Sequence, residues 1–296
     1  LMEGHDAIFL EEPPTPGFDS LLNKTLAIEE YLLSVDMDFP EFSRQTCALL
    51  QTLHEKQKKI FQVEPFLETL AGIHELFADG GAPSDLDRDS EQFIVYQAEK
   101  KATGALVQYY RTVIKGSFEE TIETVKTFAR ADAARFLLRD SLRAKALAPE
   151  VLKFPRAYVE AGYMHYALRG ELTKVLAGRA RVKPVFLMAS IVKPLLGKRQ
   201  AFGPGDILTL LYLYHPKIRG AQVDLLAARS LVYIKLLEKQ EMEEEDGLYP
   251  NTHNEVKTLQ MTQTLTFEDC KRLYSKIRLA KSDEALHIVQ TYLRGK

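Results

Sequence analysis

Cysteine is scarce, with two residues, Cys47 and Cys270, in a chain of 296. Two thiols cannot build a zinc site by themselves, and a chain of this length does not need a disulfide framework in order to fold. The first residues also lack the basic and apolar pattern of a secretory leader. We therefore expect two buried free thiols and a protein of the cytoplasm, which is a reducing compartment.

The chain also lacks a long apolar run and an excess of either charge. No stretch approaches the roughly 18 consecutive apolar residues that a membrane-spanning helix requires. The 39 lysines and arginines are balanced by 41 acidic residues, for a net charge of -2. Binding to nucleic acid requires a clustered basic surface, which these totals do not indicate, although they leave a local patch open. We expect neither a membrane nor a nucleic acid as partner.

Several well-known catalytic signatures are missing. The glycines of Gly203-Pro204-Gly205 are not followed by the third glycine or the lysine of phosphate-binding loops. The chain has no Gly-x-Ser-x-Gly elbow and no Cys-x-x-Cys pair. The chain opens with Leu1 before Met2, so we expect a natural segment upstream of Leu1.

Short apolar runs that alternate with helical patterns predict the fold. The runs at 7–10, 60–63, 157–159 and 185–188 each end at a turn or an acidic residue, as buried strands do. Parallel strands require long crossovers, which helices supply. We therefore predict an α/β fold, with a mostly parallel sheet flanked by helices and a helical C-terminal extension.

The helical patterns set the predicted domain boundaries. Two long helices, at about 90–114 and 117–148, form an insertion, and the second begins with a Ser117-x-x-Glu120 capping box. A second capping box, Thr266-x-x-Asp269, opens the last helical region, and a helix is also expected at 18–35. We predict an α/β core at 1–202, which includes the insertion at 90–148, and a helical extension at 203–296 packed on the core.

Three predicted strands run directly into glutamate, at Glu11-Glu12, Glu64 and Glu160. The carboxyl ends of parallel strands meet at one edge of a sheet, where ligands of such folds bind. Carboxylates that lie near one another raise each other's pKa and suit acid/base work or a hard metal ion. The alternative is that each glutamate only solvates a loop or caps the next helix.

Two further residues point to the same edge. His165 follows the small-residue turn at Gly162 and is expected at the start of the next helix, whose dipole would lower its pKa and keep it neutral. The alternative is a partly buried histidine bonded to a carbonyl group. Arg139 would hold an anion or orient Glu11 or Glu12 if it points to this edge, and otherwise it makes an ion pair on the helix surface.

Three motifs, AIFLEE (7–12), RDSLRA (139–144) and VEAGYMH (159–165), resemble the TraB / ChaN / erythromycin-esterase-like superfamily. The resemblance extends from Asp6 to Met188. It implies an α/β core with its site at the carboxyl edge of the sheet, and either a hydrolase, with or without a metal, or a haem-associated protein. That family carries a glycine and histidine motif on an earlier strand, which is absent here and agrees with the expected upstream segment.

The residues and the resemblance together predict a hydrolase-like site in which histidine and carboxylates activate water or hold a divalent metal, acting on a small-molecule substrate. The alternative is a non-catalytic protein that binds haem or a small anion, or engages a partner, on the same fold. A homo-oligomer is compatible with either. The predicted catalytic residues are His165, Glu12 and Arg139, and the predicted ligand-binding residues are Glu11, Glu64, Glu160 and Gly162.

Overall fold

The sheet of this protein is small and entirely parallel. The computed structural model describes residues 1–35, 39–243 and 247–296. Strand β1 (Ala7–Leu10) lies between β2 (Lys59–Gln62) and β3 (Ala157–Val159), so the order is β2-β1-β3. In this register Ile8 pairs with Ile60 on one side and with Tyr158 on the other. All three carboxyl ends therefore reach the same edge of the sheet.

The chain divides into two compact units. The first unit contains residues 1–97 and 136–184, and the second contains 98–135 and 185–296. Both boundaries within the long helical pair fall inside a helix, so each unit contains part of α5 (Glu91–Lys115) and part of α6 (Phe118–Val151).

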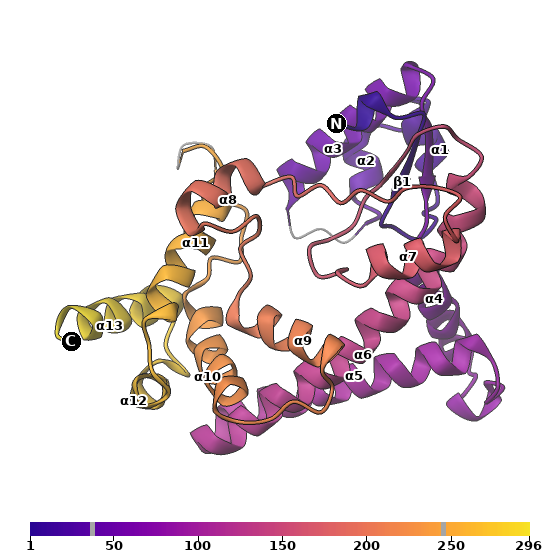
Figure 1. The fold of residues 1–296 in the computed structure, drawn as a ribbon. Helices are drawn as coiled ribbons and strands as arrows, with labels where there is room; N and C mark the ends of the chain where they lie inside the picture. Colours follow the sequence, from indigo (N-terminus) through magenta and orange to yellow (C-terminus); the bar gives the residue numbers. More distant parts are fainter. Residues whose placement is uncertain (36–38, 244–246) are drawn as a thin grey trace. The chain divides into compact units, whose positions relative to one another are not determined.

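In the first unit, β1 is buried on both faces, and its side chains alternate between two hydrophobic clusters. Ile8 and Leu10 pack with residues of α1, α2 and α3, whereas Phe9 packs with residues of α6 and α7, such as Leu147 and Leu172. Figure 1 shows α1, α2 and α3 beside β1. The other helical elements of this unit are η1 (Met2–Gly4), α1 (Phe18–Leu22), α2 (Ile28–Leu32), α3 (Pro40–Glu55), α4 (Pro65–Ala78), η2 (Pro83–Asp85) and α7 (Leu168–Leu176).

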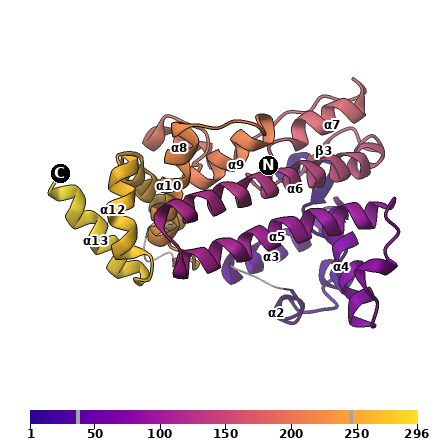
Figure 2. The same cartoon turned by 90° about the horizontal axis from the view of Figure 1, so that it is seen from below.

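The second unit is helical and has its own core. Apolar side chains of α6, among them Ile122 and Ala129, pack against α9, α10, α12 and α13. The α5 and α6 helices run side by side (Figure 2), and both carboxylate oxygens of Glu99 accept hydrogen bonds from Arg135 at 3.0 and 3.1 Å. The remaining helices are α8 (Ala189–Leu196), α9 (Pro204–Tyr214), α10 (Ala221–Leu236), α11 (Pro250–Gln263), α12 (Phe267–Ile277) and α13 (Ser282–Arg294).

The expected α/β character is confirmed, but the expectation of a mostly parallel sheet overstates the sheet. The run 185–188 is not a strand: it forms extended chain and a turn before α8, and Val185 and Leu187 are exposed. An apolar run alone does not distinguish a strand from a helix entry. The helix expected at 18–35 is two short helices, because the chain turns between α1 and α2 and Lys24 has a positive φ of 59°.

Other expectations can be compared directly. Cys47 and Cys270 are free and buried, as predicted, and burial raises their thiol pKa values to about 11 and 12. Within the described ranges, none of the helices is both long and apolar enough to cross a membrane. The division into units places residues 98–135 and 185–202 with the C-terminal helices, whereas the predicted core extended over residues 1–202.

The capping box of α6 is formed as predicted and provides a test. The Ser117 hydroxyl accepts from the Glu120 amide at 3.2 Å, and the Glu120 carboxylate accepts from the Ser117 amide at 2.7 Å. Ser117→Ala leaves the Glu120 amide unpaired, so we expect the free energy of unfolding to fall by about 1 kcal/mol in urea denaturation. Ser275→Ala, which removes an exposed hydroxyl within α12, serves as control and should change it by less than about 0.5 kcal/mol.

Candidate active site

The ends of the three strands and the helix α6 bring charged side chains together at the carboxyl edge of the sheet. Glu11 follows β1 directly, Glu64 follows β2, and Glu160 follows β3. On α6, Arg139 and Arg143 are four residues apart and so lie on the same face of the helix. We call the seven side chains that meet here the edge cluster; its members are Glu11, Glu64, Arg139, Asp140, Arg143, Glu160 and His165.

His165 is held by a carboxylate at each ring nitrogen. Its Nδ1 lies 2.5 Å from Asp140 Oδ1, and its Nε2 lies 2.6 Å from Glu11 Oε1. The imidazole side chain is only 4% exposed, and the edge of the ring meets Phe136. Burial alone would lower the pKa of His165, but the hydrogen bonds and charges of Asp140 and Glu11 outweigh it and raise the pKa to about 9. His165 is therefore an imidazolium at neutral pH.

Glu11 is the carboxylate on which most of the contacts converge. Its Oε2 accepts from the Gly162 amide at 2.5 Å and lies 3.3 Å from Arg143 Nη1, while its Oε1 lies 3.7 Å from Arg139 Nη2. Burial acts to raise the pKa of Glu11, but His165, Arg143 and the Gly162 amide together lower it. Glu11 is therefore a fixed anion, and 15% of its side chain reaches the surface.

Glu64 and Arg143 are completely buried beside it. Arg143 Nε donates to the carbonyl of Val63 at 2.8 Å, and Arg139 Nε lies 3.4 Å from Glu64 Oε1. Burial raises the pKa of Glu64 in spite of both arginines, and burial lowers the pKa of Arg143 in spite of the surrounding carboxylates. Arg143 stays a cation, and its Nε lies 3.8 Å from Glu64 Oε2, so burial acts against charge on both groups while each lies next to the other.

Glu160 is the carboxyl group most suited to exchange a proton. Its Oε2 accepts from the Glu11 amide at 3.2 Å, and burial, followed by the charges of Glu12 and Glu11, raises its pKa. The edge cluster contains four carboxyl groups and three cationic side chains. A proton shared among the carboxyl groups would balance this charge, and the raised pKa values of Glu64 and Glu160 make them the groups to hold it.

Several polar atoms of the edge cluster have no hydrogen-bond partner within the described ranges. They are both terminal nitrogens of Arg143, Glu64 Oε2 and Asp140 Oδ2, and all are buried. Buried polar atoms in this state are usually met by water or by a ligand. The cluster therefore has unused donors and acceptors, and Glu11 and Arg139 form its partly exposed side.

The structure brings together six of the seven predicted site residues. Gly162 contributes its amide to Glu11, and a Cβ added there would lie 3.6 Å from Glu11 Oε2, which is ordinary contact. Glu12 is the exception: its Oε2 accepts from Gln62 at 2.9 Å, away from His165. Successive residues of an extended chain point to opposite faces, which explains why only one of the two neighbouring glutamates reaches the cluster.

Sequence reasoning missed Arg143 and the role of Asp140. The available signal was the spacing in RDSLRA, which places residues 139 and 143 one helical turn apart. The expectation of a neutral His165 was wrong, because the helix dipole is not the controlling effect: α7 begins only at Leu168, and two carboxylates surround the ring.

The edge cluster does not fit a bound metal or haem. No group of three or more His, Cys, Asp or Glu side chains in residues 1–35, 39–243 and 247–296 is arranged to hold a metal ion. Both nitrogens of His165 already face carboxylates, so neither has a free lone pair for a metal or for haem iron. Two guanidinium groups also occupy the positions that a cation would need beside Glu11 and Glu64.

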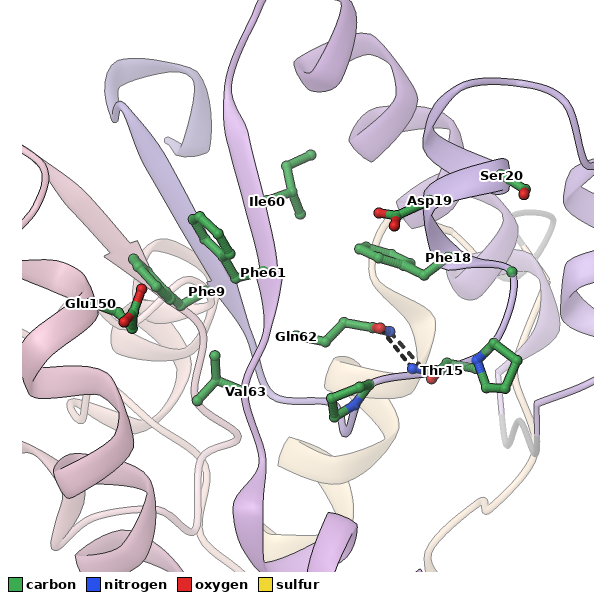
Figure 3. Close-up of a pocket in the computed structure, with 13 residues that line it drawn as sticks. Phe9, Thr15, Phe18, Asp19, Ser20, Ile60, Phe61, Gln62, Val63 and Glu150 are labelled. Carbon is green, nitrogen blue, oxygen red and sulfur yellow. Dashed lines mark hydrogen bonds between the residues drawn. The ribbon is translucent and has the colours of Figure 1, made fainter.

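A hollow of about 620 Å³ lies alongside β2. Figure 3 shows Gln62 pointing from this strand toward Thr15, whose amide donates to the Gln62 side chain at 2.9 Å, while Phe61 lies on the opposite side of the strand. Phe61 stacks on Phe9 with ring centroids 5.0 Å apart. Because Gln62 also donates to Glu12, this hollow borders the face of the carboxyl edge that Glu12 occupies.

Comparison with known proteins finds one relative of unknown function. An uncharacterized protein of Archaeoglobus fulgidus is 30% identical over 271 residues, which cover 91% of this chain and 89% of the archaeal protein. No family model matches the chain, and no solved structure matches it. The resemblance to the TraB / ChaN superfamily stays a prediction.

The charge of His165 predicts how stability depends on pH. The pKa of about 9 in the folded protein lies above the ordinary 6.5, so the stabilisation is complete below about pH 6.5 and is lost as pH rises through 9. We expect the free energy of unfolding to fall by up to about 3 kcal/mol across this range. Urea denaturation at several pH values measures the free energy of unfolding. Its fall between pH 6.5 and 9 should be absent in His165→Gln.

The pairing of Arg143 predicts a large loss of stability when it is removed. Arg143→Gln removes one of the two guanidinium groups that lie beside both Glu11 and Glu64, which should reduce the free energy of unfolding by about 3–5 kcal/mol in urea denaturation. Adding Glu64→Gln to this variant should recover part of the loss, because it removes the stranded carboxylate. Arg169→Gln, at an exposed position of α7, is the matched control; an equal loss there would contradict the assignment.

Proposed function

We propose that this chain, which belongs to the same family as the Archaeoglobus fulgidus protein, is a hydrolase. In this proposal the edge cluster activates water against a small, anionic substrate. The observation that carries this proposal is the bridge in which His165 joins Asp140 and Glu11 at the end of the central strand. A buried imidazolium between two carboxylates, one of them partly exposed, is a proton donor held ready at a surface.

Glu160 acts as the general base in this proposal. Its raised pKa brings the carboxyl group closer to neutral pH, where a base is most effective. Its hydrogen bond to the Glu11 amide holds it beside Glu11 at the end of the sheet. The Glu160 carboxylate takes one proton from water, and the resulting hydroxide attacks the electrophilic centre of the substrate.

The bridge supplies the proton that the leaving group needs. His165 Nε2 passes its proton to the Glu11 carboxylate, 2.6 Å away, and Glu11 passes it on to the leaving group. Asp140, bonded to Nδ1, keeps the ring oriented and stabilises its charged form before transfer. The proton from water stays on Glu160 until the product leaves, so one proton is gained and one released in each turnover.

The arginines indicate that the substrate is anionic. Arg139 is 16% exposed beside Glu11, and the terminal nitrogens of Arg143 have no hydrogen-bond partner in the part of the chain that the structure describes. A guanidinium group binds carboxylate or phosphate oxygens with two parallel hydrogen bonds. Negative charge that develops during attack would be stabilised by the same groups.

A substitution at Glu160 tests the proposal. Purified protein would be assayed against chromogenic carboxylic esters, phosphate esters and peptides, each in an anionic and a neutral form. With the best substrate we expect Glu160→Gln to lower kcat by about 10²–10⁴-fold, because the base is lost. Glu30→Gln, at an exposed position of α2, should leave kcat within about twofold of the unchanged protein.

The pH profile of kcat/KM provides a second readout. Activity should rise as Glu160 loses its proton and fall as His165 loses its proton near pH 9, which produces a bell-shaped curve. In Glu160→Gln the rising limb should disappear. Equal activity in Glu160→Gln and the unchanged protein, or no preference for anionic substrates, would refute the proposed roles.

Binding without turnover is the second candidate, supported by the terminal nitrogens of Arg143, which make no hydrogen bond within the described residues although one of them lies 3.3 Å from Glu11 Oε2. In that case a small carboxylate or phosphate would occupy the edge cluster and no ester or peptide would be cleaved. Calorimetric titration with inorganic phosphate and with acetate separates the two: binding that is lost in Arg139→Gln, without hydrolysis of any substrate tested, favours the binding protein.

A further inference from the structure

Positive charge is segregated in one stretch of the chain. Residues 172–205 contain seven lysines and arginines and no aspartate or glutamate, whereas charges nearly cancel over the whole sequence. The part of this stretch from residue 185 onward belongs to the second unit and includes α8. The near-neutral total charge therefore conceals a basic segment, and three of its cations, Lys193, Lys198 and Arg199, belong to the second unit.

Part of α8 packs on α11 of the same unit, and other residues of the helix are exposed. Val192 is buried in a cluster with Val256 and Leu259 of α11, and Met188 and Leu196 pack against the same cluster. Figure 1 shows α8 lying beside α11. The exposed residues of α8 are Lys193, Pro194 and Leu195.

Cations and aliphatic side chains are exposed together around α8. Leu187 is 65% exposed, Val185 53% and Leu195 40%. Lys193, Lys198 and Arg199 are exposed, and none of them forms a salt bridge with any residue that the structure describes. These six exposed residues of the segment 185–199 define what we call the α8 surface: Val185, Leu187, Lys193, Leu195, Lys198 and Arg199.

We propose that the α8 surface docks the protein on an anionic phospholipid membrane. Exposed lysine and arginine are attracted to the negative surface potential of anionic lipid head groups. Exposed aliphatic side chains gain free energy by entering the boundary between head groups and acyl chains. The combination of both kinds of side chain in one short segment matches this interface.

The aliphatic side chains favour a lipid surface over a nucleic acid. A nucleic acid would be held by the cations alone or by aromatic side chains that stack on bases, and it offers no apolar layer for Leu187 and Leu195. The prediction that the protein has no membrane partner rested on the lack of a spanning run. Peripheral docking requires no spanning helix, so the helices observed are compatible with it.

Sedimentation with lipid vesicles tests the proposal on the full chain. We expect the protein to bind vesicles of phosphatidylcholine with phosphatidylglycerol and not vesicles of phosphatidylcholine alone. Raised salt should weaken the binding. The variant Lys193→Gln/Lys198→Gln/Arg199→Gln should lower the partition coefficient about 100-fold, which is about fivefold for each cation near the surface.

Two further variants separate lipid docking from simple charge attraction. Leu187→Ser/Leu195→Ser keeps every charge and should lower the partition coefficient by about tenfold, because the aliphatic contacts are lost. The matched control Lys101→Gln/Lys276→Gln/Lys281→Gln removes the same net charge from exposed positions elsewhere in the chain. It should lower the partition coefficient by less than threefold, because only the net charge of the protein changes. Circular dichroism and urea denaturation establish that each variant is folded.

Three results would overturn the proposal. Equal binding to neutral and anionic vesicles would rule out the cations as the cause, and unchanged binding of Leu187→Ser/Leu195→Ser would rule out insertion. Binding to single-stranded RNA without binding to anionic vesicles would assign the α8 surface to nucleic acid instead. None of these measurements uses the edge cluster, so they are independent of the proposed hydrolysis.

Discussion

The buried imidazolium of His165 is the interaction on which the carboxyl edge of the sheet depends. Moving a charged group out of water costs several kcal/mol, and only close opposite charges and hydrogen bonds repay that cost. Asp140 and Glu11 meet the two ring nitrogens, and Arg143 then balances Glu11. Each member of the edge cluster is tolerable in the interior only because the others are present, so the cluster is a single cooperative feature.

This dependence determines how α6 meets the sheet. Arg139, Asp140 and Arg143 reach three different partners from little more than one helical turn, and Arg143 is also bonded to the backbone of Val63 after β2. Turning α6 by one residue, about 100°, would remove both guanidinium groups from the carboxylates. The apolar contacts of Ala144 and Leu147 against Phe9 define the same orientation, so packing and electrostatics agree.

The sequence was informative where the signal is local. The strands at β1, β2 and β3, the glutamates that follow them and the capping box at Ser117 depend on neighbouring residues, and the structure contains them. The choice between Glu11 and Glu12 and the charge of His165 depend on which side chains tertiary packing brings near, and spacing does not contain that information. The false strand at 185–188 had the composition of a real one but no neighbouring strand to pair with.

Averaged composition conceals both charged features of this protein. In the edge cluster, buried charges of opposite sign lie close together and nearly cancel. They therefore contribute little to the electrostatic field outside the molecule. Around α8, Lys193, Lys198 and Arg199 form no salt bridge with the residues that the structure describes and stay exposed, where they attract anions over a Debye length of about 8 Å. A net charge of -2 is compatible with the buried edge cluster and with the exposed cations around α8, because the total counts buried and exposed charges alike. A total charge can therefore exclude a class of binding partner only for the surface taken as a whole, and not for an individual segment of the chain.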